Sequence, residues 1–242
     1  MAKKRSATST RAKPGKARPP AKERARSAPQ RRTRVAKVAG SGRPGRTRSP
    51  EPSAGATASG ADPAAGRIIR RTTIHAGNKY QYHDVVIRGD DGRPLHRQMV
   101  KHPGAVTVLP LLDTPDGVRV VIIRNERFAV ARTLIELPAG TLEPGEDPSV
   151  SGVRELEEEI GYTSSSLRPL GTFFTTPGLT DEIMYAYVAT NLVFVGQRLE
   201  ADEKIQVEMV TPDEALAMID DGRMMDAKSM LALLLARRQG LL

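Results

Sequence analysis

The sequence contains no cysteine and no tryptophan, and aromatic residues make up only 4% of its 242 positions. Without cysteine, the chain forms no disulfide, offers no thiolate nucleophile and holds no metal through sulfur. No apolar run reaches the roughly 18 residues that a membrane-spanning helix needs. We therefore expect a soluble protein without membrane contact, with the cytoplasm as its default location.

The first 66 residues also lack Ile, Leu, Phe, Tyr and Trp, and they contain eight Pro and seven Gly. Such a segment cannot bury enough apolar surface to offset the entropy lost when a chain orders. It also lacks the apolar stretch of a secretory signal, and its prolines disfavour the amphipathic helix of a transit peptide. We predict a disordered basic tail over residues 1–66, followed by a single folded domain over residues 67–242.

The net charge of +9 belongs entirely to this tail. Residues 1–66 carry 17 basic and three acidic side chains, a net +14, whereas residues 67–242 carry 20 basic and 25 acidic side chains, a net −5. The overall charge therefore does not indicate that the folded part binds nucleic acid. The tail itself favours either a weak, salt-sensitive contact with nucleic acid or another polyanion, or a solvated appendage without a partner.

The remaining sequence alternates strand and helix patterns. Hydrophobic periodicity and turn residues predict three helices, over 148–160, from Pro212 to about Gly222, and over about 227–238. Thr211 and Asp226 are the expected N-caps of the last two helices, and the Thr211 end is a capping box with Glu214. Strands are predicted at 80–86, 104–112, 118–123, 134–137, 173–174, 184–190 and 205–210. Strands on both sides of one mid-chain helix indicate an α/β sandwich around a mixed sheet.

The most informative stretch runs from Gly140 to Tyr162. Gly140 is followed after five residues by Glu146, and after seven more by Arg-Glu-Leu-Glu-Glu-Glu-Ile-Gly-Tyr. On a helix, Glu155, Glu158 and Glu159 share one face because they are three and four residues apart. A second face, made by Val153, Leu156 and Ile160, is apolar and can pack against a sheet.

Like charges at this spacing repel one another and destabilise a bare helix. Arg154 lies four residues before Glu158 and can hold its carboxylate. Divalent cations among the carboxylates would relieve the repulsion, and hard oxygen ligands favour Mg²⁺ or Mn²⁺. The alternative is a solvated acidic helix face, but the complete spacing would arise by chance only on the order of once in a million chains.

This stretch resembles the signature of the Nudix hydrolases, Gly-x5-Glu-x7-Arg-Glu-U-x-Glu-Glu-x-Gly-U, where U is a bulky aliphatic residue. Every fixed position is matched, and Tyr162 at the last aliphatic position is the one departure. The resemblance implies the Nudix α/β/α sandwich and an enzyme that hydrolyses a nucleoside diphosphate linked to another moiety. It implies Mg²⁺, with Mn²⁺ as the alternative. The metal ligands it implies are Glu155, Glu158, Glu159 and the carbonyl of Ala139, with Arg154 orienting them and Glu146 supporting the loop.

Flanking segments resemble the ADP-ribose pyrophosphatase branch of the family. They are Lys101–Val106, Glu136–Gly140, Thr176–Glu182 and the isolated Arg127. This resemblance implies the products AMP and ribose 5-phosphate. The substrate-binding residues it implies are Arg127, Glu136, Pro177, Gly178 and Glu182.

The same branch usually draws its general base from a loop beyond the signature helix. Glu203 is our first candidate, as base or additional metal ligand, and Glu200 the second, with a merely acidic turn as the alternative. Glu182 is a weaker candidate for the base. The branch also implies a homodimer that exchanges N-terminal strands, here about residues 67–100. The four histidines show no metal-ligand spacing and are interpreted as non-metal residues.

Two other functions stay open at this point. The enzyme could act on another nucleotide sugar, such as GDP-mannose, or on a dinucleoside polyphosphate, because the signature serves all of these substrates. Alternatively, the domain could be a non-catalytic nucleotide sensor that contacts nucleic acid through the tail. A sensor of this kind often lacks signature glutamates, and this sequence has them all.

Overall fold

The structure is a computed structural model that describes residues 66–201 and 203–242, all of which lie in one compact unit. The disordered tail predicted for residues 1–66, and its polyanion contact, therefore fall outside the described residues, Gly66 excepted. No helix in the described ranges is long and apolar enough to cross a bilayer.

A seven-stranded sheet forms the centre of the fold. Its main path has the order β10-β5-β4-β9-β8, and two short strands extend it, β6 beside β5 and β7 beside β4. The β4–β9 pair is parallel and the other pairs are antiparallel, so the sheet is mixed, as predicted. The strands are β4 (Ala105–Thr114), β5 (Gly117–Arg127), β6 (Arg132–Glu136), β7 (Ala139–Thr141), β8 (Tyr162–Phe174), β9 (Ile183–Phe194) and β10 (Ile205–Val210).

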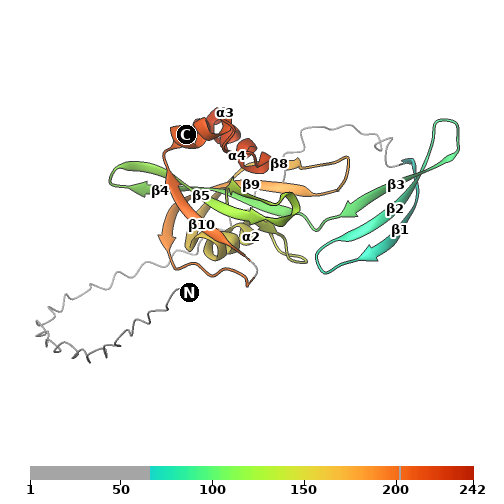
Figure 1. Ribbon diagram of the computed structural model, residues 1–242, viewed down its shortest axis with the longest axis horizontal. Helices are drawn as coiled ribbons and strands as arrows, with labels where there is room; N and C mark the ends of the chain where they lie inside the picture. The colour runs from blue at the N-terminus through green and yellow to red at the C-terminus, as the bar shows by residue number, and fades with distance from the viewer. Residues whose placement is uncertain (1–65, 202) are drawn as a thin grey trace, which may run out of the picture. The chain divides into compact units, whose positions relative to one another are not determined.

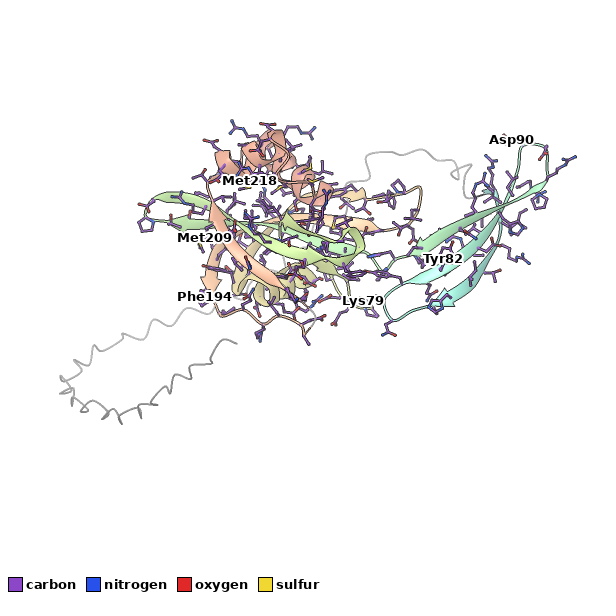
Figure 2. The ribbon with its side chains drawn as sticks, viewed as in Figure 1. Lys79, Tyr82, Asp90, Phe194, Met209 and Met218 are labelled. Atoms are coloured by element: carbon purple, nitrogen blue, oxygen red, sulfur yellow. The ribbon has the colours of Figure 1, made fainter. Side chains whose placement is uncertain are left out.

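The sheet is covered on both faces, which makes the fold a sandwich (Figure 1). Along β5, Val120 and Ile122 face the core shared with α3 (Pro212–Asp220) and α4 (Ala227–Arg238). Val121 and Ile123 face the opposite core, which is shared with the signature helix. This alternation follows from the two-residue period of a strand, and it explains why β4 and β5 read as continuous apolar runs. Met218, labelled in Figure 2, is an α3 contribution to the first core.

The helix ends follow from local chemistry. The signature helix begins at Asp147, whose side chain accepts from Ser149 N, and continues as α2 (Pro148–Glu155) into a π-helical turn, η2 (Leu156–Ile160). It stops at Gly161, which has a φ of 74°. The caps predicted at Thr211 and Asp226 are both confirmed. Only the Thr211 half of the capping box is present, because the Glu214 carboxylate lies 3.7 Å from Arg223 instead.

The predicted strand at 173–174 is the end of a much longer one. β8 spans 13 residues and lies at the edge of the main path, where it pairs with β9. Its sequence contains Pro169 and Gly171, and the pairing register shifts between these two positions. Proline and glycine are disfavoured inside strands and tolerated at edges and bulges, which is why the periodicity hid this strand.

A second sheet has the order β1-β2-β3 and is antiparallel throughout. Its strands are β1 (Ile68–Ala76), β2 (Gln81–Arg88) and β3 (Pro94–Lys101), of which only β2 was predicted as a defined strand. Every residue of β1 is exposed. β3 meets the segment before β9 through Val100 N, which donates to the carbonyl of Leu179 at 2.9 Å.

Candidate active site

β7 is the strand around which the signature side chains collect. Its glycine, Gly140, packs against the carboxylate of Glu155, and a Cβ at this position would overlap that carboxylate. The preceding residue, Ala139, donates its N–H to Glu159 Oε2 at 2.8 Å. The glycine of the signature is therefore required by the close approach of a buried side chain to the backbone.

Two of the three glutamates predicted to bind metal are buried. Glu155 retains 6% and Glu159 only 2% of its surface, whereas the side chain of Glu158 is 32% exposed. Burial raises the pKa of Glu155 to about 7, although the charge of Arg154 opposes the shift. Burial likewise raises the pKa of Glu159 well above its ordinary value. Both carboxylates are thus held where a negative charge is poorly solvated.

Arg154 links the loop and the helix. Its guanidinium donates to both carboxylate oxygens of Glu146, at 3.1 and 3.0 Å. It also donates to Glu155 at 2.7 Å and to Glu158 at 3.0 Å. The hydrogen bonds from Arg154 lower the pKa of Glu146 to about 2. The contact expected between Arg154 and Glu158 is present, and two further carboxylates share the same arginine.

The sequence predicts that Glu155, Glu158 and Glu159 share one helix face. As the side chains stand, no group of three or more His, Asp or Glu residues within 66–201 and 203–242 is arranged to hold a metal ion. Nη1 of Arg154 donates to both Glu155 and Glu158 and so lies between two of these carboxylates. The carboxylate oxygens of these glutamates nevertheless suit a divalent cation. A hard, positively charged ion offsets the cost of burying carboxylates that have few protein partners.

Glu203, the first base candidate, is half-buried in the loop before β10. Its charge contributes to the raised pKa of both Glu155 and Glu159. Its own carboxylate accepts the backbone N–H of Glu200 at 2.9 Å, which closes the loop before β10. Glu200, the second candidate, is exposed at the start of the same loop.

A pocket of about 440 Å³ opens beside β7. All three residues of β7 line it, so its wall is continuous with the backbone that contacts Glu155 and Glu159. Aromatic and charged side chains from distant segments form the rest of its lining. They include Tyr80, His102, Phe174, Arg127, Glu182 and Lys228.

Arg127 and Glu136, both predicted to bind substrate, bind each other. Nε and Nη2 of Arg127 donate to the two oxygens of Glu136 at 2.8 and 2.6 Å. Lys228, at the start of α4, adds contacts to Glu136 at 2.6 Å and to Asp226 at 2.9 Å. Burial of Glu136 favours its neutral form, but the bonds and charges of Arg127 and Lys228 outweigh this and lower its pKa. Arg127, Lys228 and Asp226 line the pocket, whereas Glu136 does not.

Only part of the loop between β8 and β9 lines the pocket. Glu182 and the threonines Thr175 and Thr176 line the pocket, whereas Pro177 and Gly178 are exposed and lie outside its lining. The carbonyl of Thr176 closes the turn by accepting from the N–H groups of residues 179 and 180.

Sequence reasoning missed Lys228, His102 and Tyr80 as pocket residues. Lys228 had one usable signal, since it follows the Asp226 cap by two positions and so had to lie at a helix N-terminus. The other two residues are brought to the pocket by tertiary contacts between separate strands. No spacing in the sequence encodes such contacts.

An acidic helix is thus held against a glycine-containing strand, beside a pocket in a fold with a mixed sheet. Comparison with known proteins identifies the class of protein to which this arrangement belongs. The model of the NUDIX domain matches residues 101–233. The chain therefore belongs to the Nudix family. It is a Nudix hydrolase acting on pyrophosphate bonds, which confirms the predicted family, fold and enzyme class.

Individual relatives are more specific. The chain is 35% identical over 169 residues to the ADP-ribose pyrophosphatase of Bacillus subtilis (strain 168), covering 69% of this chain and 90% of the relative. It is also 35% identical over 174 residues to the methanol dehydrogenase activator of Bacillus methanolicus, covering 69% and 92%. A crystal structure of an ADP compounds hydrolase shares the fold, with a TM-score of 0.62, 20% identity, and coverage of 72% of this chain and 96% of that one.

Proposed function

We propose that this chain hydrolyses the diphosphate of ADP-ribose, or of a closely related nucleoside diphosphate sugar, in the presence of Mg²⁺. The products would be AMP and ribose 5-phosphate. One observation carries the proposal: two buried carboxylates, Glu155 and Glu159, contact β7, whose three residues line a 440 Å³ pocket. The names of several relatives, which are ADP-ribose pyrophosphatases, support this choice of substrate.

The roles of individual residues follow from their positions. Glu155, Glu158, Glu159 and the Ala139 carbonyl would hold Mg²⁺, or Mn²⁺, which neutralises diphosphate charge and lowers the pKa of water. Arg154 holds the carboxylates in place through its bonds to Glu155 and Glu158. Glu203 accepts the proton of the attacking water, with Glu200 as the second candidate, while the new P–O bond forms and the bridging P–O bond breaks.

The rest of the pocket would bind the two ends of the substrate. Arg127 and Lys228 place positive charge at its wall, which suits a diphosphate. Glu136 keeps the Arg127 guanidinium in one orientation through two hydrogen bonds. Glu182 accepts hydrogen bonds from sugar hydroxyls, and the turn at Pro177 and Gly178 sets the position of the loop that carries it.

A substrate panel tests the proposal. Released monophosphate is measured for ADP-ribose, ADP-glucose, GDP-mannose and a dinucleoside polyphosphate, each with Mg²⁺, with Mn²⁺, and with chelator. We expect metal-dependent turnover with the highest kcat/KM for ADP-ribose. A higher kcat/KM for one of the other substrates reassigns the enzyme within the family. Binding of ADP-ribose without any turnover identifies a nucleotide sensor and contradicts the proposal.

We also propose a homodimer and an independent domain. The exposed strand β1 favours association through residues 67–100, and residues 67–242 are expected to fold and hydrolyse substrate without the tail. Deleting residues 1–66 should leave kcat/KM unchanged and remove any salt-sensitive binding of nucleic acid. Binding to nucleic acid that survives the deletion contradicts the assignment of the positive charge to the tail.

A further inference from the structure

His102 and Glu182 face each other at the starts of two parallel strands. The parallel ladder pairs Ala105 of β4 with Met184 of β9. Just before it, the Asp181 carboxylate accepts from the backbone N–H of His102 at 2.8 Å and from Lys101 Nζ at 2.6 Å. These bonds hold the two strand entrances together. They place Nε2 of His102 at 3.4 Å from Oε1 of Glu182.

The other contacts of the His102 ring show which of its two nitrogens carries the proton. Nδ1 lies 3.0 Å from the backbone N–H of Gly104 and accepts from it. A ring nitrogen that accepts a hydrogen bond carries no proton, so this geometry assigns the proton of the neutral ring to Nε2, facing Glu182. Burial lowers the pKa of His102 against the opposing charges of Glu182 and Asp181, in agreement with a neutral ring.

The ring is also fixed in its plane. Tyr80, from the turn between β1 and β2, stacks on it with the ring centroids 4.9 Å apart and the planes at 25°. The His102 side chain is only 10% exposed. The ring is therefore held with Nε2 toward the Glu182 carboxylate, in a 3.4 Å contact that is longer than an ordinary hydrogen bond.

Glu182 is held from its other side as well. Its second carboxylate oxygen accepts from the hydroxyl of Thr175, and its backbone N–H donates to Thr180 Oγ1 at 3.1 Å. The carboxylate nevertheless lines the pocket, with 21% of the side chain exposed. Each carboxylate oxygen can accept two hydrogen bonds. Thr175 thus holds one oxygen, the His102 ring lies 3.4 Å from the other, and the carboxylate keeps capacity for a ligand.

We propose that His102 is a positioning residue, which orients Glu182 as the acceptor for hydroxyl groups of the sugar in the substrate. The inference rests on the proposed function, because a nucleoside diphosphate sugar is the ligand that brings hydroxyls to this pocket. His102, which also lines the pocket, acts through Glu182. This role is distinct from metal binding, in keeping with the spacing of the four histidines.

Two substitutions test the roles of the two ring nitrogens of His102 separately. In His102→Asn, the amide oxygen replaces Nδ1 as the acceptor for Gly104, and the donor to Glu182 is lost. In His102→Gln, an amide N–H replaces Nε2–H, and the acceptor for Gly104 is lost instead. We expect the Asn variant to raise KM for ADP-ribose by up to about tenfold, because the polar group that faces Glu182 is lost, with kcat within about threefold of wild type. The Gln variant should restore KM to within about threefold.

A second background tests whether His102 acts through Glu182. Glu182→Ala should raise KM by itself, and His102→Asn should add nothing to it. Thermal unfolding of each variant reports folding separately from binding, and ¹⁵N NMR of the imidazole should show the Nε2-protonated tautomer in the wild type. An Nδ1-protonated ring, or additive effects of the two substitutions, overturns the inference.

The order of the two His102 variants separates this role from a structural one. If the Gln variant is impaired and the Asn variant is not, the ring only supports the turn at Gly104, and the inference is wrong. If the wild type is active but its KM for ADP-ribose equals that of the Asn variant, the role of His102 is wrong and the proposed function stands. A wild type that is inactive on every nucleoside diphosphate sugar overturns the proposed function together with the sugar site.

Discussion

The seven-stranded sheet is packed by helices on both faces, whereas the sheet of β1, β2 and β3 is largely bare. From Ala105 to Leu111, every residue of β4 is buried, and no residue of β1 is. Within the described part of the chain, the three-stranded sheet supplies only Val85 and Val86 to the buried apolar set. Tyr82 and Asp90, labelled in Figure 2, belong to its exposed surface.

This difference separates two kinds of stability. A sheet covered on both faces is stabilised within its own chain, while a bare three-stranded sheet gains little from burial until another surface covers it. β1 still carries large apolar side chains: Ile69 is 50% and Ile74 is 53% exposed. The covered sheet should therefore carry the chemistry and the folding stability, and the bare sheet the association.

The largest effect should come from a signature glutamate of the covered sheet. Glu159→Gln removes the charge of a carboxylate that is 2% exposed and bonded to Ala139 N. We expect kcat/KM with Mg²⁺ to fall about 10³-fold, equivalent to about 4 kcal/mol of transition-state stabilisation. Steady-state release of AMP measures this. The melting temperature without metal should not fall, because a poorly solvated charge is removed, and full activity in this variant would sink the catalytic assignment.

Matched isoleucines compare the two sheets in stability. Ile122, in β5, is fully buried, and Ile74, in β1, is 53% exposed. Ile122→Ala should lower the free energy of unfolding by about 2–5 kcal/mol through lost burial and an unfilled cavity. Ile74→Ala should change the monomer by about 0.5 kcal/mol or less. Urea unfolding at low protein concentration measures both, and equal losses would remove the distinction between the sheets.

The Arg127–Glu136–Lys228 cluster should make stability depend on acid pH. The folded-state pKa of Glu136 lies below its ordinary value of 4.5. Its ion pairs therefore contribute fully above that value, and the contribution is lost as the pH falls through the folded-state pKa. Glu136→Gln should cost about 1–3 kcal/mol at pH 7 and flatten the acid dependence. Unfolding at pH 7 and pH 3 tests this, and an unchanged pH profile in the variant would contradict it.

The smallest effect should appear in the bare sheet. Replacing Ile69 and Ile74 together by Glu places two charges on the exposed strand β1. We expect the dimer dissociation constant to rise about tenfold, or about 1.4 kcal/mol, while the melting temperature of the monomer changes little. Sedimentation equilibrium provides the measurement, and Val118, which is 39% exposed in the covered sheet, provides a matched control as Val118→Glu. An equal weakening by the control would mean that association does not involve β1.

Much of the covered sheet could be predicted because its signals are local. The bounds of β10, the caps at Thr211 and Asp226 and the stop at Gly161 all follow from short-range chemistry. The fixed spacing from Gly140 to Gly161 also allowed the enzyme class to be predicted. β1 and β3 were missed as defined strands because their faces are exposed, so the alternation of polar and apolar residues is weak.

Other features were hidden because their causes are not local. The π-helical turn at Leu156–Ile160 has no periodicity that distinguishes it from a continuous α-helix over so few residues. Arg127 was expected to be available to a phosphate, yet its partner Glu136 comes from the adjacent strand and Lys228 from α4. Such partnerships arise from packing, and the spacing of residues along one segment cannot reveal them.

The parallel pairing of β4 with β9 has a consequence for how the family can vary. The ladder fixes which residues meet at the strand entrances, whatever the length of the chain between the two strands. That intervening chain carries β7 and the signature helix and ends at Glu182, directly before β9, whereas His102 lies just before β4. Insertions in the intervening loops leave that pair in register. If His102 and Glu182 bind the sugar as proposed, changes at the two strand entrances would alter the sugar preference and leave the signature intact.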